Sequence, residues 1–324
     1  MGGNAIKSAS RINKQQYDVA VLKLEHILVQ SGTAFDVVPA YFNKETFGDI
    51  DAVIAQPLTV DKVKELFGAT EIVKNSNVIS FGFNVEGLPT IQVDLIYQSE
   101  ETFEFAVAYF SFNDLGNLMG RIFHKMGMKF GHDGLWLPMR DGTNQFHEIL
   151  LTQDFEEALS IIGLDYDRWC HGFADLTGIF EFVRSSKFFN SDIYLLDNRN
   201  AISRVRDSKR KTYMEFLKYN EKNPLSRYTF VKDKSFYLPL IFAHFPDAGL
   251  EYFNVMEEHR LKMAAKLVFN GDLVREWTGL EGKALGEFMQ QLKTVNPRLC
   301  DYKLVLEMDD EEIKKMVMTT FQKL

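Results

Sequence analysis

Two aspartates one residue apart, Asp49 and Asp51, stand in the apolar segment "GDIDAVIA". Successive side chains of a β-strand point to opposite faces, so a strand here directs both carboxylates to one side and Ile50 to the other. Two adjacent negative charges resist ionising together unless a cation lies between them. The pair therefore has two explanations: a solvated strand end or a metal site.

A third carboxylate, Asp94, lies in a second predicted strand, "TIQVDLIY", where Val93 and Leu95 face the opposite way. Three carboxylates from neighbouring strands could hold two magnesium or manganese ions, because such cations take oxygen ligands. Two ions about 3.5–4 Å apart can clamp the attacking and leaving oxygens of a phosphoryl displacement. Phosphoryl transfer is the chemistry that this pattern indicates, with solvated acids as the alternative.

The same spacing recurs at Asp165 and Asp167, which gives an internal comparison. That pair follows one predicted helix and precedes another, so it is predicted to cap a helix. The pair at 49 and 51 differs because Gly48 precedes it, which allows backbone and ligand to approach closely, and because apolar strand residues follow it.

Strands alternating with short helices surround the three acids. Helical spacing covers residues 14–30, and a short helix is predicted at 59–68 between a capping Thr59 and a terminating Gly68. Residues 77–98 are predicted to form a hairpin that turns near Gly87. A helical stretch follows at about 101–128, and then a hairpin over 135–151 with Asp141 and Gly142 at its tip.

Helical periodicity dominates from residue 152 onward. The predicted helices are 154–163, 174–185, 206–219, 247–269 and 284–294, with a further surface helix near the C-terminus. We therefore predict an α+β fold with a boundary near residue 150, which separates a sheet-containing part (1–150) from a mostly helical part (151–324).

The composition limits the classes of partner that this protein could bind. A net charge of −8 over 324 residues argues against a generic nucleic-acid coat, although "SRVRDSKRKTY" forms a local basic stretch. Within it Lys209, Arg210 and Lys211 are candidate contacts to a nucleic-acid backbone, and a solvated helix face is the alternative. No run of 18 apolar residues exists, so no membrane span is expected.

Cysteine usage bears on the compartment. The two cysteines, Cys170 and Cys300, lie far apart and lack metal-ligand spacing. They are expected to be reduced, buried thiols, and the first residues lack the apolar segment of a signal peptide. A cytoplasmic, reducing location is the expectation.

"NKETFGDIDAVIA" resembles the catalytic strand of the DNA polymerase β-like nucleotidyltransferases, and specifically that of family X polymerases. The segment from Tyr109 to Pro138 is similar to the family's next motif, a Tyr-Phe pair followed by a helix that carries Asn and, four residues later, Arg. Here these residues are Tyr109, Phe110, Asn117 and Arg121. The resemblance covers roughly residues 37–138.

The resemblance implies a palm-like mixed β-sheet with flanking helices, followed by a mostly helical domain that could bind the acceptor. It implies that Asp49, Asp51 and Asp94 hold two metal ions and that Asp94 activates a 3′-hydroxyl. Tyr109 and Phe110 would border the nucleotide's sugar, with core packing as the alternative. Further nucleotide contacts would come from Lys44, Gly48, Asn117 and Arg121. For Asn117 and Arg121 the alternatives are contact with the opposing strand and an ordinary solvated helix face.

The chain departs from the family where the triphosphate would be cradled. Val38 and Pro39 occupy the positions of a Gly-Ser or Gly-Gly pair at a helix start, and proline has no N–H to donate. Gly2, Gly3 and Asn4, with Lys7 and Arg11 following, could supply a substitute. Phe112 replaces a family glycine in a tight turn. Residues 269–292 show a weak similarity to tail segments of CCA-adding and poly(A)-polymerase-type enzymes.

The resemblance implies transfer of a nucleoside monophosphate from an NTP or dNTP to a hydroxyl acceptor, with release of pyrophosphate. A nucleic-acid 3′ end (RNA, tRNA or DNA) is the favoured acceptor. Two alternatives remain: nucleotidylation of a protein or small molecule, and an inactive nucleotide- or nucleic-acid-binding protein that has lost its phosphate cradle.

Overall fold

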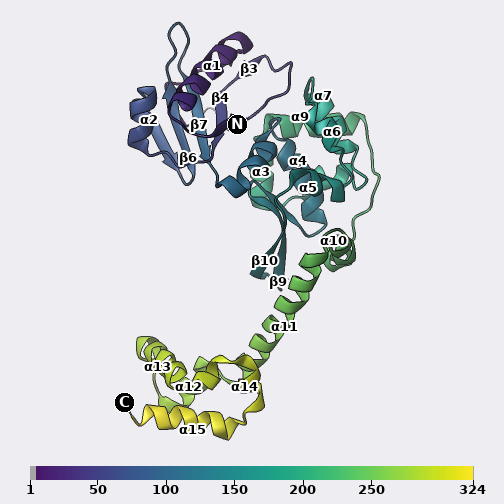
Figure 1. The fold of residues 1–324 in the computed structure, drawn as a ribbon. Coiled ribbons are helices and arrows are strands. Elements are labelled where there is room, and N and C mark those ends of the chain that lie inside the picture. The colour runs from purple at the N-terminus through teal and green to yellow at the C-terminus, as the bar shows by residue number, and fades with distance from the viewer. Residues whose placement is uncertain (1–4, 324) are drawn as a thin grey trace. The chain divides into compact units, whose positions relative to one another are not determined.

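The computed structural model describes residues 5–323 of a mixed α+β protein (Figure 1). The chain divides into two compact units, Met1–Phe245 and Pro246–Leu324. The predicted boundary near residue 150 coincides with a change of secondary structure inside the first unit. The last strand, β10, ends at Thr152, and the elements after it are helices.

A five-stranded mixed sheet forms the N-terminal part of the first unit. In sheet order its strands are β2 (Phe35–Val37), β4 (Asp49–Ile54), β7 (Ile91–Tyr97), β6 (Val78–Phe83) and β5 (Ile72–Asn75). The central strands β4 and β7 run parallel, and every other pair is antiparallel. The predicted strand at 49–55 and the predicted hairpin at 77–98 are both confirmed.

One face of this sheet carries the main apolar core. Ile50, Ala52, Val93 and Leu95 lie on that face, in the alternation that β-strands impose. The helices α1 (Lys14–Gln30) and α2 (Val60–Phe67) cover it, as Figure 1 shows. The residues that alternate with these along the strands, Asp49, Asp51 and Asp94, are therefore directed to the other face.

Local capping sets the ends of both helices. The Asn13 side chain accepts from the backbone N–H of Gln16 in a capping box that begins α1. Thr59 accepts from the N–H of Lys62 at the start of α2, and Gly68 ends it in the left-handed conformation. Both helices confirm the sequence-based ranges. A short pairing of β1 (Ile12–Asn13) with β3 (Thr46–Phe47) joins the start of α1 to the segment before β4.

The helical stretch predicted at about 101–128 consists of two helices. These are α3 (Glu100–Phe110) and α4 (Leu115–Lys125). Phe112 and Asn113 between them have φ of 60° and 65°, a left-handed conformation that no helix contains. Phe112, which replaces a glycine of the family that the sequence resembles, is one of the two residues in this turn.

A second, antiparallel sheet follows, made of β8 (Lys129–Gly131), β9 (Gly134–Asp141) and β10 (Asn144–Thr152). Asp141 pairs with Asn144, which confirms the predicted hairpin tip.

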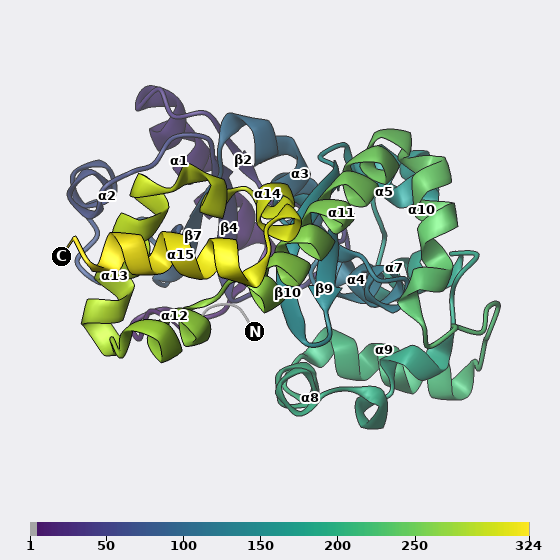
Figure 2. The same cartoon turned by 90° about the horizontal axis from the view of Figure 1, so that it is seen from below.

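The rest of the first unit is helical. Its elements are α5 (Phe155–Ile161), α6 (Tyr166–Cys170), α7 (Leu176–Arg184), η1 (Ser191–Tyr194), η2 (Leu196–Asn198), α8 (Ala201–Ser208), α9 (Lys211–Lys222), η3 (Lys234–Tyr237) and α10 (Leu238–His244). Asp165 caps α6, as predicted. The predicted helix at 206–219 is wrong, because the chain breaks at Lys209 and Arg210 between α8 and α9, which lie next to each other (Figure 2).

The second unit is wholly helical within the described residues. It contains α11 (Pro246–Val268), α12 (Gly271–Thr278), α13 (Gly282–Val295), η4 (Pro297–Cys300), α14 (Tyr302–Glu307) and α15 (Asp310–Phe321). Its own core includes Val274, Phe288, Leu292, Ile313 and Val317. The helices predicted at 247–269 and 284–294 are confirmed.

Two further expectations, one on membrane spans and one on the cysteines, can be compared with the structure. Within residues 5–323, no helix combines the length and the apolar character that crossing a membrane requires. The expectation of buried thiols is wrong, because Cys170 and Cys300 are both exposed. Cys170 ends a short surface helix and Cys300 ends a 3-10 turn, and neither position is covered by its unit's core.

Candidate metal centre

Three aspartates converge on the face of the main sheet opposite the α1–α2 core. Asp49 and Asp51 come from β4 and Asp94 from β7, and Asp51 and Asp94 are partners in the parallel register. One carboxylate oxygen from each residue lies within 4.8 Å of those of the other two, and all three side chains are partly buried. Such a set of oxygen donors could hold a metal ion.

The electrostatics of the cluster favour a bound cation. Burial first, and then the neighbouring charges of Asp49 and Asp94, raise the pKa of the Asp51 carboxyl to about 8. Burial likewise raises the pKa of Asp94. A cation would stabilise the ionised carboxylates, so the three residues fit a divalent metal by donor chemistry and by charge.

Lys44, for which the sequence predicted a phosphate contact, lies beside this cluster. Burial lowers the pKa of its ammonium, while Asp49 and then Asp51 oppose that shift. Its Nζ lies 4.6 Å from the ring centroid of Phe47 and donates to Oδ1 of Asn113 at 3.3 Å. Lys44 therefore links the acids to the turn between α3 and α4. Gly48 is buried directly before Asp49, between β3 and β4.

Asp94 has additional partners that the sequence analysis missed. Gln92 Nε2 donates to both of its carboxylate oxygens, at 2.8 and 3.0 Å. The Ser80 hydroxyl also hydrogen-bonds it and, like Gln92, opposes the effect of burial on its pKa. Both residues could have been found from the sequence, since Gln92 shares the strand face of Asp94 two positions away and Ser80 is its partner on β6.

Val38 and Pro39 lie in the segment where the resemblance would place a phosphate cradle. Residues 38–45, all within the described chain, form no helix. The Val38 N–H donates to the Asp51 carbonyl, and the N–H groups of Phe42 and Asn43 donate to carbonyls of Phe173 and Ala174. The Pro39 carbonyl accepts from the Phe112 N–H. These three N–H groups are already used, so a phosphate contact at these positions would depend on side chains such as that of Lys44.

Tyr109 and Phe110 are partly buried at the end of α3. Their rings meet edge to face, with centroids 5.3 Å apart, and Phe110 stacks on His132 at 5.9 Å. Phe110 also packs against the small apolar cluster around Val53, which supports the packing alternative. Burial raises the pKa of the Tyr109 hydroxyl, and Arg210 and Arg206 oppose that shift, so the basic stretch lies near this residue.

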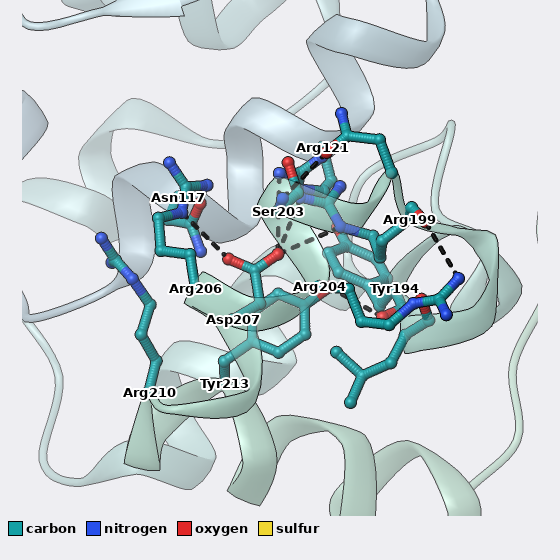
Figure 3. Close-up of polar contacts among 12 residues, drawn as sticks. Asn117, Arg121, Tyr194, Arg199, Ser203, Arg204, Arg206, Asp207, Arg210 and Tyr213 are labelled. Carbon is teal, nitrogen blue, oxygen red and sulfur yellow. Dashed lines mark hydrogen bonds and ion pairs between the residues drawn. The ribbon is translucent and has the colours of Figure 1, made fainter.

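Asn117 and Arg121 of α4 do not form a solvated helix face. They belong to a polar network with α8, shown in Figure 3, that is centred on Asp207. Asp207 is fully buried and pairs with Arg199 at 2.7 Å, with Arg206 at 3.3 Å and with Arg121 at 3.8 Å. Arg206 also donates to the Asn117 side chain at 3.2 Å. The network holds Asn117 and Arg121 against the basic stretch.

The three candidate nucleic-acid contacts differ in their surroundings. Arg210 forms an ion pair with Asp114 at the start of α4, so it serves the contact between α9 and α4. Lys209 is exposed, and Lys211 is exposed with a long contact of 3.9 Å to Glu215. Only the two lysines therefore keep the solvent access that a phosphate contact needs. The proposed substitute cradle at Gly2, Gly3 and Asn4 lies outside the described residues.

The sequence did not identify Asp207 as the centre of this network. Its partner Arg121 lies on α4, far from Asp207 in the chain, so no local pattern of residues pairs the two.

Comparison with known proteins assigns no family to this chain. No protein-family model matches this chain, and no curated protein matches it.

Proposed function

We propose that this protein is a metal-dependent nucleotidyltransferase built on a polymerase-β-like palm. The observation that carries the proposal is the convergence of Asp49, Asp51 and Asp94 on one sheet face, with donor oxygens within 4.8 Å of one another and Lys44 beside them. The resemblance of "NKETFGDIDAVIA" to the catalytic strand of that family supports it.

In this proposal Asp49, Asp51 and Asp94 would hold Mg²⁺ or Mn²⁺. Such ions, when bound, neutralise charge on the transferring phosphoryl group. The acceptor's hydroxyl oxygen forms a bond to the α-phosphorus of the nucleoside triphosphate, and the bond from that phosphorus to the pyrophosphate oxygen breaks. Asp94 takes the hydroxyl proton, and pyrophosphate leaves. Lys44 would attract the negatively charged phosphates, and positioning would supply much of the remaining rate enhancement.

A nucleic-acid 3′ end is the acceptor that we favour, because the resemblance extends through Tyr109, Phe110, Asn117 and Arg121, which the family uses near the sugar and base. The exposed lysines Lys209 and Lys211 would contact its backbone.

One observation favours a second candidate, a nucleotide-binding protein without catalysis. The N–H groups of Val38, Phe42 and Asn43 are bonded to other parts of the chain and Pro39 has none, so these four positions offer no backbone donor to a phosphate. Such a protein would bind NTP and release no pyrophosphate.

The test combines acceptor and metal in one assay. Purified protein is incubated with Mg²⁺ or Mn²⁺, each labelled NTP and dNTP, and mixed tRNA, single-stranded RNA and primed DNA, with Asp49→Asn alongside. Asp165→Asn is the matched control, because Asp165 and Asp167 have the same spacing as Asp49 and Asp51, and Asp165 caps a helix. We expect extension by the wild type and Asp165→Asn and a loss of at least about 100-fold in Asp49→Asn.

The other outcomes separate the candidates. Pyrophosphate release that needs a protein or small molecule in place of nucleic acid would identify that acceptor class. Nucleotide binding without pyrophosphate release under any acceptor would establish the second candidate and contradict the enzymatic proposal.

A further inference from the structure

The N-terminal segment, residues 5–10, is tied to the main sheet through its backbone. The N–H groups of Ala5 and Ile6 donate to Oε1 of Gln92 at 2.8 and 3.1 Å. Those of Lys7 and Ser8 donate to the Glu71 carboxylate at 2.7 and 3.1 Å. The Ser10 N–H donates to the Thr90 carbonyl at 2.8 Å, and the Ile6 side chain is 2% exposed. This segment is therefore fixed beside β7.

Gln92 joins this segment to the metal centre. Its side chain is 2% exposed, and its Nε2 donates to both oxygens of Asp94 while its Oε1 accepts from Ala5 and Ile6. The two ends of the amide have opposite hydrogen-bonding character. A reversed amide would set its NH₂ group against two N–H donors and its oxygen against a carboxylate. The backbone N–H groups of residues 5 and 6 thus decide which end of Gln92 faces Asp94.

We propose that Gln92 is a positioning residue for Asp94 and that the N-terminal segment sets its orientation. The inference rests on the proposed function only in that Asp94 is taken as a metal ligand. Outer partners that donate to a ligating carboxylate restrict its rotation and favour its charged form, and their loss commonly weakens metal binding about 10- to 100-fold.

Direct measurement of Mn²⁺ binding by electron paramagnetic resonance, without nucleotide, tests the role of Gln92. Gln92→Met keeps the side chain's length and removes both hydrogen-bonding ends. We expect its Mn²⁺ dissociation constant to rise about 10- to 100-fold. Gln98→Met is the matched control, since Gln98 is another buried glutamine just past β7 whose partners are His132 and Thr102. Unchanged Mn²⁺ affinity in a folded Gln92→Met protein would overturn the inference.

A second variant tests the N-terminal segment and leaves Gln92 in place. Glu71→Ala removes the acceptor for Lys7 and Ser8 at a partly buried position, so it keeps the inference testable if Gln92→Met does not fold. We expect Mn²⁺ affinity to fall, though by less than in Gln92→Met. Glu65→Ala is its control, because it also removes one carboxylate, which is exposed and forms an ion pair with Lys62. Equal affinities in the two variants would contradict the role assigned to the segment.

The wild-type measurement separates this inference from the proposed function. If the wild type binds no divalent cation, both are wrong. If it binds Mn²⁺ and loses it in Asp49→Asn but not in Gln92→Met, only the positioning role is wrong.

Discussion

Asp51 and Asp94 are register partners across the parallel strands β4 and β7, so their carboxylates leave the sheet from the same face. Asp49 lies on that face two residues earlier. The arrangement concentrates negative charge at one place on a partly buried surface. Its energetic consequences can be measured without knowing the substrate.

The first prediction concerns pH and Asp51. Its carboxyl has a pKa near 8 in the folded protein, above the value of an exposed aspartate, because of burial and then of the neighbouring acids. The folded state therefore holds this proton more tightly than the unfolded state. The resulting stability is present below about pH 4 and is lost as the pH rises toward 8. The metal-free wild type should accordingly melt at a lower temperature at pH 8.5 than at pH 5.

Asp51→Asn removes this titration. We expect the metal-free variant to melt at least about 5 °C above the wild type at pH 8.5 and by a smaller margin at pH 5. Calorimetry in a chelating buffer measures both, with Asp165→Asn as the control for loss of an aspartate. A melting temperature of Asp51→Asn that follows the wild type at both pH values would contradict the prediction.

The second prediction concerns the metal. A ligand that binds the folded state alone stabilises it by RT ln(1 + [L]/Kd), so saturating Mg²⁺ at pH 8 should raise the melting temperature of the wild type. In Asp94→Asn one ligand charge is lost, and the increase should be absent or much smaller. Thermal scans over a Mg²⁺ series check this. An equal increase in both proteins would place the bound cation elsewhere.

The third prediction concerns the buried hub Asp207. Asp207→Asn keeps the size of the side chain but leaves Arg199 and Arg121 without their buried counter-charge. Removing one partner of a buried ion pair typically costs about 3–5 kcal/mol, so we expect the free energy of unfolding to fall by that amount. Urea denaturation at pH 7 provides the measurement. The exposed Asp197→Asn serves as the control and should change stability by less than about 0.5 kcal/mol.

The fourth prediction concerns the two exposed lysines of the basic stretch. Lys209→Ala with Lys211→Ala should weaken binding of single-stranded RNA and lower the slope of log affinity against log salt by about 1 to 2. Binding titrations at several salt concentrations give the slope. Lys62→Ala with Lys64→Ala, on α2, removes the same charge and should leave the slope unchanged. Equal slopes in all three proteins would argue against a nucleic-acid contact at this stretch.

Much of the local structure followed from the sequence. The caps at Asn13, Thr59 and Gly68 act within a few residues, so the chain specifies where α1 and α2 begin or end. The helix prediction that failed, at 206–219, crossed a break at Lys209 and Arg210. This break contains no glycine or proline, so no residue type in the sequence marks the end of one helix and the start of the next.

The sequence by itself determined that Asp49 and Asp51 share a strand face, because side-chain alternation is a local property of extended backbone. Only the tertiary structure decided that Asp94 stands opposite Asp51, since the register of two parallel strands depends on a crossover and on packing across the whole sheet. The same holds for Gln92 meeting Ala5 and Ile6, and for Asp207 meeting Arg121. Contacts between residues distant in the chain are selected by burial and charge pairing in three dimensions, which no single segment encodes.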